Sequence, residues 1–544
     1  MSIQATRTEA DSDRARALEV LTDPAHAEIV DVVVWRDGPD GYGAANAGGE
    51  VSFRRRNVGT GWVFDVEVVA GANPFADQST DRFVGLAAEM AGKYPRQADN
   101  SYPYAYEQVA QLFDSPDAPD LCVIHSARHN WEDHGGERGE HGSLDLIQSR
   151  APFIIGGAGI ARAGVVDRHA RLIDVAPTVL ALLGAGATTA GVGLNGSSRP
   201  DAVLARQDGE PIADVRDPAA AAPQRVIGIL WDGCNPNVLL DMVARGEAPN
   251  VARLIEMGQA FSGGALASLP TITLANHTSI LTGAHPGHHG ILNNAWWSRR
   301  LGRQVITNSP ATWPQSMETL DASVETIHQA VHRNWPDALT WSVNEPCDVG
   351  ADYSTFAVIR GGELPPFPPE AAELPHATER FVRPVKSYRL SSRIDQTAVD
   401  QAVALIGGHY RDQEWPAPRF AWINFTLTDA AFHHGGPHSD IARASIADSD
   451  GRLGEIFAAA EAAGWWDTTA WVLVADHGME DSDPTCTGDW DEALRAAGVQ
   501  FRDEAYSFIY LGDFSGSDGA GHTAAPVSAL EAAVGLDGDG REGV

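Results

Sequence analysis

Apolar runs recur in the second half of the chain, each followed by polar or glycine-rich sequence. The runs at 226–230, 420–425 and 469–475 are rich in β-branched and aromatic residues, a composition typical of buried strands. Segments with helical spacing of apolar positions separate them. This alternation over residues 225–513 predicts an α/β fold, with a doubly wound, mostly parallel sheet flanked by helices.

The first 184 residues carry comparable patterns. Short strands are expected at 32–35, 61–70, 121–124 and 153–155. A helix is expected at 175–183, ended by Gly184. In the later block, a helix is expected at 251–257, with Asn250 as its N-cap and Gly258 as its stop.

Acidic residues follow each of the three strands predicted in the second half. They are Asp232 after the first strand, Asp429 with His433 after the second, and the adjacent Asp476 and His477 after the third. Because the carboxyl ends of parallel strands meet at one edge of a sheet, we expect these side chains to converge. Carboxylates and imidazoles together suit zinc-like ions. The four-residue spacing from Asp429 favours His433 over His434, because it places both side chains on one helical face.

Two threonines, Thr271 and Thr273, precede an expected helix at 275–282. A hydroxyl among metal ligands suits nucleophilic attack, and the backbone amides at the amino end of a helix can bind phosphate oxygens. The alternative is that both hydroxyls only cap the helix. The pattern by itself leaves both interpretations open.

Four motifs stand in a fixed order between residues 226 and 480: VIGILWDG, PTITLANHTSILTGAHPGHHGILNN, TLTDAAFHHGGP and VADHGME. With this combination the chain resembles the alkaline phosphatase superfamily, and within it the nucleotide pyrophosphatase/phosphodiesterase and phosphonoacetate hydrolase branch. The resemblance implies an alkaline-phosphatase-like fold. It also implies two divalent metal ions as cofactors, with zinc expected and manganese as the alternative.

The resemblance further implies roles for individual residues. The family nucleophile precedes an Asn-His pair by three residues, which selects Thr273 over Thr271. One ion would be held by Asp232, Asp476, His477 and Thr273, and the other by Asp429, His433 and His141. Asn294 matches the amide that binds a phosphoryl oxygen in the family, and Asn293 is the alternative by register.

The other histidines are not expected to bind metal. His277, His288 and His289 are expected to be structural and satisfied by backbone carbonyls. His125, His129 and His134 suggest either a separate metal cluster or a polar loop near the edge of the active site, and we favour the loop.

The order of the motifs is unusual, because the turn His141-Gly142-Ser143 and the strand and helix after it resemble the end of a family domain. We therefore expect a circularly permuted chain. Its parts are a family C-terminal-like segment at 1–184, a linker at 185–224, a catalytic core at 225–513 and a flexible tail at 514–544. The alternative is a degenerate duplicate fused to a complete domain, in which His522 would be the last metal ligand.

The net charge and the cysteine content limit which partners and which compartment we expect. The formal net charge of −34 argues against a nucleic-acid polymer or an anionic membrane surface as partner. Bound divalent cations would reverse the local field for an anionic substrate. The four cysteines form no Cys-x-x-Cys pattern, and neither an apolar leader nor a membrane-spanning run is visible, so we expect a cytoplasmic enzyme. The sequence does not specify the oligomeric state.

The expected function is a metal-dependent hydrolase acting on small phosphodiester or nucleotide-pyrophosphate-type substrates through a covalent phospho-threonine intermediate. A phosphomonoesterase or phosphonate hydrolase on the same scaffold is the first alternative. A sulfatase is disfavoured, because those enzymes use a modified Cys or Ser. The alternative from another class is a non-catalytic, metal-stabilised binding module.

Overall fold

The computed structural model describes residues 3–131, 136–309, 311–366, 386–505 and 508–514. Its largest sheet has eight strands in the order β19-β18-β22-β13-β23-β8-β14-β9. These are β19 (Tyr353–Ser354), β18 (Thr340–Val343), β22 (Phe420–Phe425), β13 (Arg225–Trp231), β23 (Thr469–Val474), β8 (Phe153–Gly157), β14 (Gly258–Phe261) and β9 (Gly164–Val166). All neighbouring strands are parallel except at β8, which is antiparallel to both β23 and β14.

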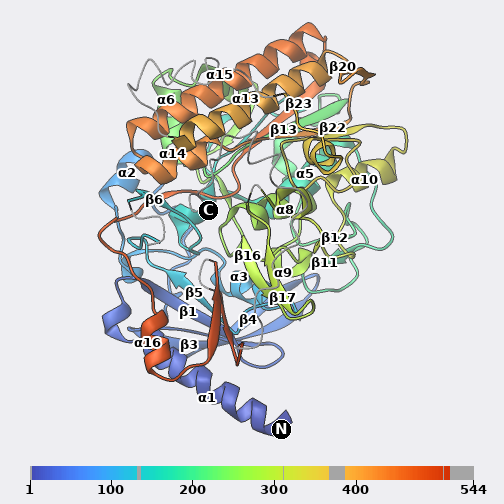
Figure 1. Cartoon of the computed structure of the whole chain (residues 1–544). Coiled ribbons are helices and arrows are strands. Elements are labelled where there is room, and N and C mark those ends of the chain that lie inside the picture. The colour runs from blue at the N-terminus through green and yellow to red at the C-terminus, as the bar shows by residue number, and fades with distance from the viewer. Residues whose placement is uncertain (1–2, 132–135, 310, 367–385, 506–507, 515–544) are drawn as a thin grey trace.

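Helices cover both faces of this sheet (Figure 1). On one side lie α6 (Pro236–Ala244), α13 (Lys386–Ile406), α14 (Leu427–Gly435) and α15 (Asp440–Ala462). On the other side lie α5 (Val175–Leu183), α8 (Thr273–Thr282) and α10 (Ile327–Asn334). Fully buried tryptophans on the central strands, among them Trp231, Trp422 and Trp471, fill the core between the layers. The predicted α/β fold with a mostly parallel sheet is confirmed.

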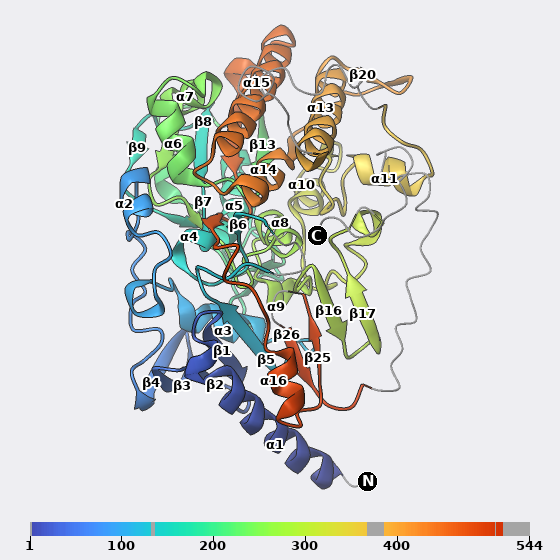
Figure 2. The ribbon, with the colours of Figure 1, turned by 60° about the vertical axis from the view of Figure 1, so that its left-hand side comes forward.

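A second sheet of seven strands is antiparallel throughout and was not predicted (Figure 2). Its order is β25 (Phe501–Glu504), β26 (Phe508–Leu511), β5 (Leu121–His125), β1 (Val30–Arg36), β2 (Gly41–Asn46), β3 (Gly49–Val58) and β4 (Gly61–Gly71). The individual strands at 32–35, 61–70 and 121–124 were expected. Their sheet combines strands from both ends of the chain, which no local pattern indicates.

The other helices and strands complete the fold. The helices are α1 (Ile3–Leu21), α2 (Leu86–Ala91), α3 (Ala105–Leu112), α4 (Leu146–Ser149), α7 (Pro249–Glu256), α9 (Pro286–His289), α11 (Thr355–Arg360) and α16 (Asp491–Ala496). The strands are β6 (Gly139–Glu140), β7 (Arg150–Ala151), β10 (Ala170–Arg171), β11 (Val192–Gly193), β12 (Arg206–Gln207), β15 (Ala265–Leu266), β16 (Ala295–Ser298), β17 (Arg303–Ile306), β20 (His409–Tyr410), β21 (Gln413–Glu414) and β24 (Glu480–Asp481). No helix in the described part of the chain combines the length and apolar character that crossing a bilayer requires.

The helix boundaries show where local reasoning succeeds. Helix α5 spans the expected residues and ends at Gly184, whose φ of 78° is left-handed. Helix α7 begins earlier than predicted, and Asn250 is not its N-cap. The reason is tertiary: the Asp450 carboxylate on α15 accepts the backbone N–H groups of Asn250 (3.0 Å) and Val251 (2.8 Å). A carboxylate from another helix thus caps the amino end of α7 in place of a local side chain.

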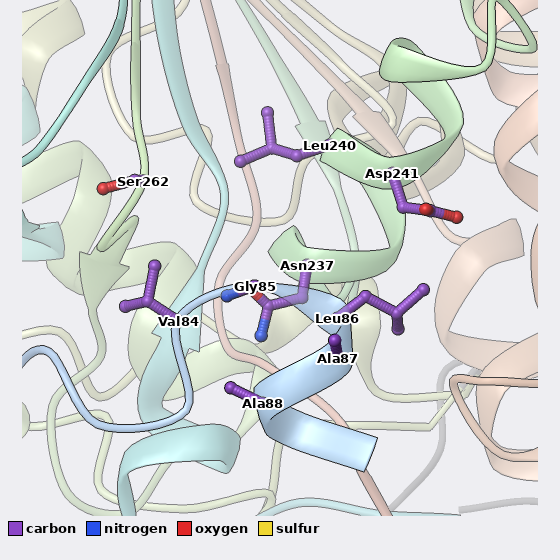
Figure 3. A pocket seen from close by; sticks show the side chains of 9 residues that line it. All are labelled: Val84, Gly85, Leu86, Ala87, Ala88, Asn237, Leu240, Asp241 and Ser262. Atoms are coloured by element: carbon purple, nitrogen blue, oxygen red, sulfur yellow. The ribbon is translucent and has the colours of Figure 1, made fainter. Parts of the chain in front are cut away.

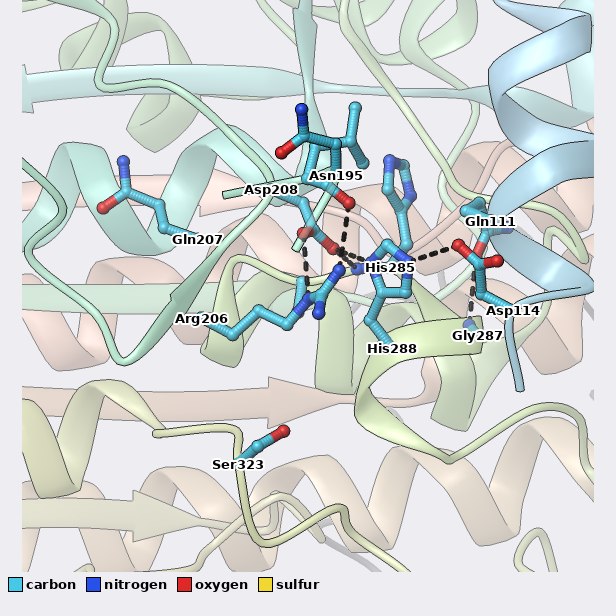
Figure 4. A network of polar contacts seen from close by, with 12 residues as sticks. Gln111, Asp114, Asn195, Arg206, Gln207, Asp208, His285, Gly287, His288 and Ser323 are labelled. Carbon is cyan, nitrogen blue, oxygen red and sulfur yellow. Dashed lines mark hydrogen bonds and ion pairs between the residues drawn. The ribbon is translucent and has the colours of Figure 1, made fainter. Parts of the chain in front are cut away.

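Residues 185–224 connect the two blocks in sequence and pack firmly. Leu204 and Ile212 lie in the main apolar core. Asp208 lies between Arg206 and His288 in a buried polar network (Figure 4). Its carboxylate also accepts the backbone N–H of His285 at 2.8 Å, which holds the start of α9. In the predicted flexible tail, Phe514 packs on Trp297, and residues 515–544, with His522, lie outside the described residues.

Candidate metal centre and nucleophile

Three adjacent strands deliver the acidic residues to one edge of the main sheet. Asp232 directly follows β13, β22 leads through Thr426 into α14 with Asp429, and β23 leads to Asp476 and His477. Because the sheet order is β22-β13-β23, their carboxyl ends lie side by side. The structure therefore brings together the residues that the sequence placed at strand ends.

Gly233 shows how closely the chain segments approach here. Its φ is 60°, and a Cβ atom at this position would lie 2.7 Å from Asp429 Oδ1. Its N–H donates to Asp476 Oδ1 at 3.1 Å. Only glycine combines the left-handed conformation with this contact, so Gly233 keeps two of the three carboxylates in place.

The first group of candidate ligands surrounds Asp429. Its Oδ1 lies 3.4 Å from His433 Nε2 and 3.9 Å from His141 Nε2. The His141 and His477 rings stack with centroids 3.7 Å apart. Ligand atoms of His141, Asp429 and His477 all lie within 4.8 Å of one another. His434, the alternative to His433, is exposed.

The second group surrounds Asp232 and Asp476. His477 Nε2 lies 3.1 Å from Asp476 Oδ2 and 3.6 Å from Asp232 Oδ1, so His477 stands between the two groups. His277, which the sequence predicts to be structural, also belongs here. Its Nε2 lies 3.6 Å from Asp476 Oδ2 and 3.8 Å from Asp232 Oδ2. The available signal was its position four residues after Thr273 on one helix face.

Three of the imidazoles share one hydrogen-bond pattern. The Nδ1 atoms of His141, His433 and His477 lie 2.8–2.9 Å from the backbone carbonyls of Thr271, Gly139 and Gly478, respectively. With the Nδ1 proton on these bonds, each Nε2 offers a lone pair toward the carboxylates. This is the arrangement that metal-binding histidines require.

These residues fit divalent metal ions. Asp232 Oδ1, Asp429 Oδ1, Asp476 Oδ2, His277 Nε2 and His477 Nε2 are buried and make no hydrogen bond among the described residues. Such atoms are costly in a folded protein unless a cation satisfies them. The donor separations of 3.1–3.9 Å are close to the roughly 3.4 Å expected between two ligands of a tetrahedral zinc ion.

Electrostatics point the same way. Burial, together with the neighbouring Asp476 and Asp429 carboxylates, raises the pKa of Asp232 well above its usual value. Burial opposes ionisation of Asp429 as well, but the adjacent His433 outweighs it and lowers the pKa of Asp429. Burial and the neighbouring imidazoles lower the pKa of His141. No Arg or Lys forms an ion pair with these three carboxylates in the described part of the chain.

The two candidate nucleophiles differ in their hydrogen bonds. The Thr271 hydroxyl donates to Ser143 O at 2.7 Å and accepts from Gly142 N at 3.0 Å, and Thr271 is fully buried. The Thr273 hydroxyl makes no hydrogen bond within the described residues, and Thr273 is 8% exposed. Thr273 is the first residue of α8, whose N-cap Ile272 provides no side-chain bond. Its hydroxyl and the first backbone amides of α8 are therefore available to a ligand.

The two candidate amides differ in the same way. Asn293 donates to Ala505 O at 2.6 Å and accepts the Asn294 N–H at 2.7 Å, so its side chain has a structural role. Asn294 is 2% exposed, and its Oδ1 has no partner among the described residues. These contacts favour Asn294 over Asn293 as the ligand-binding amide.

Most of the other histidines contact the protein backbone or its carboxylates. His125 Nε2 lies 3.2 Å from His141 O, and His129 Nε2 lies 2.8 Å from Gly488 O. His289 Nε2 lies 3.0 Å from Ala275 O, and His288 joins the network around Asp208. His134 lies outside the described residues.

A surface pocket elsewhere is unrelated to this centre. It measures about 540 Å³, lies between α2 and α6, and is lined by Val84, Leu86, Leu240 and Asp241 among others (Figure 3). None of the candidate ligands or nucleophiles lines it.

Comparison with known proteins gives a family and more distant likenesses. Residues 226–529, more than half of the chain, match the family described as type I phosphodiesterase / nucleotide pyrophosphatase. Alkaline phosphatase PafA of Elizabethkingia meningoseptica is 27% identical over 123 residues, 22% of each chain. Alkaline phosphatase PhoV of Synechococcus elongatus is 34% identical over 85 residues, 16% of each. The chain thus matches about a fifth of the length of these curated relatives.

Solved structures show likeness of the same modest extent. Murine ectonucleotide pyrophosphatase/phosphodiesterase 5 has 15% identity and a TM-score of 0.35, covering 55% of this chain and 70% of that one. Phosphonoacetate hydrolase from Sinorhizobium meliloti 1021 has 21% identity and a TM-score of 0.30, covering 47% and 57%.

Proposed function

Because this chain belongs to the type I phosphodiesterase / nucleotide pyrophosphatase family, we propose that it hydrolyses phosphate esters with Thr273 as its nucleophile. Small phosphodiesters or nucleotide-pyrophosphate-type molecules are the proposed substrates. One observation carries this proposal: the unbonded Thr273 hydroxyl lies one helical turn before His277, whose Nε2 faces two carboxylates. The nucleophile and the candidate metal ligands thus share one face of α8.

The proposed reaction has two displacements at phosphorus. Thr273 Oγ1 forms a bond to phosphorus as the bond to the leaving oxygen breaks, and water then cleaves the phospho-threonine and restores the hydroxyl. Two divalent ions, zinc or manganese, would stabilise the attacking and leaving oxygens in such a displacement. The Asn294 amide and the open N–H groups of α8 would donate to the non-bridging phosphoryl oxygens as negative charge develops on them.

The charge around the centre favours a diester over a monoester. A phosphodiester carries one negative charge near neutral pH, and a phosphomonoester carries close to two. Neutral donors such as Asn294 suit the single charge. A monoester would benefit from an Arg or Lys, and none pairs with the cluster carboxylates in the described ranges.

We also propose that the amino-terminal block completes the same catalytic unit, as a circular permutation would. The support comes from β8, which lies between β23 and β14 in the main sheet, and from His141 beside Asp429. The strand pair β6–β24 joins the loop before His141 to the segment after His477.

The test is hydrolysis of bis(p-nitrophenyl) phosphate and of p-nitrophenyl phosphate, before and after treatment with a chelator. We expect the diester to be preferred, activity to disappear with chelator, and zinc or manganese to restore it. Preference for the monoester would favour the phosphomonoesterase alternative. Activity that persists after chelator treatment would refute the proposal. Absence of activity after zinc or manganese is restored would also refute it and would favour the non-catalytic binding module.

A further inference from the structure

His277 occupies a position that the strand-end motifs do not explain. It lies in the second turn of α8 and is 1% exposed. Its Nδ1 lies 2.8 Å from Glu345 Oε2, and Glu345, just after β18, is fully buried. The Glu345 carboxylate is itself held, because its Oε1 accepts the Cys347 N–H at 2.9 Å.

The other ring nitrogen faces two acceptors that it does not bond. His277 Nε2 lies 3.6 Å from Asp476 Oδ2 and 3.8 Å from Asp232 Oδ2, distances too long for a hydrogen bond. The Nε2 atom and Asp476 Oδ2 have no hydrogen-bond partner among the described residues. A lone pair that faces carboxylate oxygens in a buried site is repulsive unless a proton or a metal cation lies between them.

Glu345 gives the imidazole the orientation that a ligand needs. A carboxylate that accepts the Nδ1 proton fixes the tautomer, so Nε2 presents its lone pair toward Asp232 and Asp476. The same carboxylate makes the imidazole a stronger donor. In His141 and His477 a backbone carbonyl sets this orientation, and in His433 a backbone carbonyl does so together with the Glu137 carboxylate at 3.0 Å. In His277 the buried Glu345 side chain does so.

We propose that His277 is an additional ligand of the cation held by Asp232 and Asp476, and that Glu345 is its positioning residue. This inference rests on the metal centre of the proposed function. It adds a nitrogen donor to an ion that the sequence assigned to Asp232, Asp476, His477 and Thr273. Nitrogen donors favour zinc over manganese, so His277 biases this ion toward zinc.

The test measures binding of Co²⁺ to metal-free protein, without substrate. Visible absorption of Co²⁺ reports its ligands, and titration against a chelator gives stoichiometry and affinity. Wild type is compared with His277→Leu, with Glu345→Gln and with the double variant, which removes the imidazole without leaving a buried charge unpaired. His328→Leu is the matched control, because His328 is also fully buried and its ring nitrogens have no partner among the described residues.

Wild type and the control should bind two equivalents. The two variants that lack the imidazole should lose about 10–100-fold in affinity for one equivalent, with an altered spectrum for that ion. Glu345→Gln should weaken the same ion by about 10-fold with its spectrum largely retained. Competition should show a larger loss for Zn²⁺ than for Mn²⁺ in the His277 variants.

Wild-type affinity and spectrum in folded His277→Leu or in the double variant would overturn the proposal. If circular dichroism shows that neither folds, Glu345→Gln decides, and unchanged affinity there overturns it equally. The proposed function can fail independently of this inference. If wild-type protein binds two Co²⁺ ions but hydrolyses no ester, the proposed activity is refuted and the assignment of His277 stands. An active enzyme whose His277 variants bind both ions normally keeps the activity and loses this inference.

Discussion

Substitution of the two neighbouring threonines by valine separates structural from catalytic function. Valine matches the shape of threonine and removes only the hydroxyl. Thr271→Val removes the bonds to Ser143 O (2.7 Å) and from Gly142 N (3.0 Å), and leaves both groups buried without partners. At about 1–3 kcal/mol for each such group, the free energy of unfolding should fall by about 2–6 kcal/mol.

Thr273→Val should leave stability nearly unchanged and reduce activity. The Thr273 hydroxyl makes no hydrogen bond within the described residues, so its removal should change stability by less than about 1 kcal/mol. Loss of the nucleophile should reduce kcat on the nitrophenyl diester by at least about 10³-fold. Thr273→Ser should restore part of that activity, because a hydroxyl returns to the same position.

The assays are urea unfolding followed by circular dichroism and steady-state hydrolysis with both metals restored. Thr278→Val is the control, because its hydroxyl donates to the Leu274 carbonyl of its own helix and otherwise contacts weakly bonding sulfur atoms, and it should change both quantities little. Full activity in Thr273→Val would refute the assignment. A Thr271→Val variant that is as stable as wild type but inactive would also refute it.

Three further predictions address other parts of the molecule. Asn294→Ala should lower kcat by about 10²–10³-fold with metal content unchanged, and metal loss in this variant would assign Asn294 a structural role instead. Burial raises the pKa of Asp31 to about 7, so native protein retains a proton that unfolded protein releases near pH 4, and stability falls as pH rises between these values. The slope is about 1.4 kcal/mol per pH unit and falls as Asp31 ionises near pH 7, so urea unfolding should show Asp31→Asn gaining about 2 kcal/mol on wild type between pH 5 and pH 7, and parallel pH profiles would contradict this. A fragment of residues 225–544 lacks β8 and His141, so it should be insoluble or inactive, whereas an active soluble fragment would favour the duplicate domain and His522.

The sequence predicted the central strands of the main sheet and the convergence of acidic residues at their ends, because both depend on local patterns. The continuous apolar stretches at β13, β22 and β23 have no good alternative to buried strands, and an acidic residue after each must then reach the same edge. The order of those strands in the sheet was not needed to predict that convergence.

Other features depend on contacts between distant segments. The pairing of β26 with β5 joins residues near 508 to residues near 122, and nothing in either strand identifies its partner. His277 was missed for the same reason, since its environment comes from Asp232, Asp476 and Glu345, three residues far apart in the chain. Glu345 belongs to no recognisable motif, so only the fold reveals its contact with His277.

The placement of β8 has a consequence for how the chain matures on the ribosome. This strand is synthesised more than 300 residues before β23, one of its two neighbours in the sheet. During that interval its apolar edge has no partner from β23. His141 is likewise synthesised nearly 300 residues before Asp429 and more than 300 residues before His477. A nascent chain interrupted before residue 469 therefore exposes an incomplete, aggregation-prone sheet. Such a product needs chaperones to keep it soluble or proteases to degrade it.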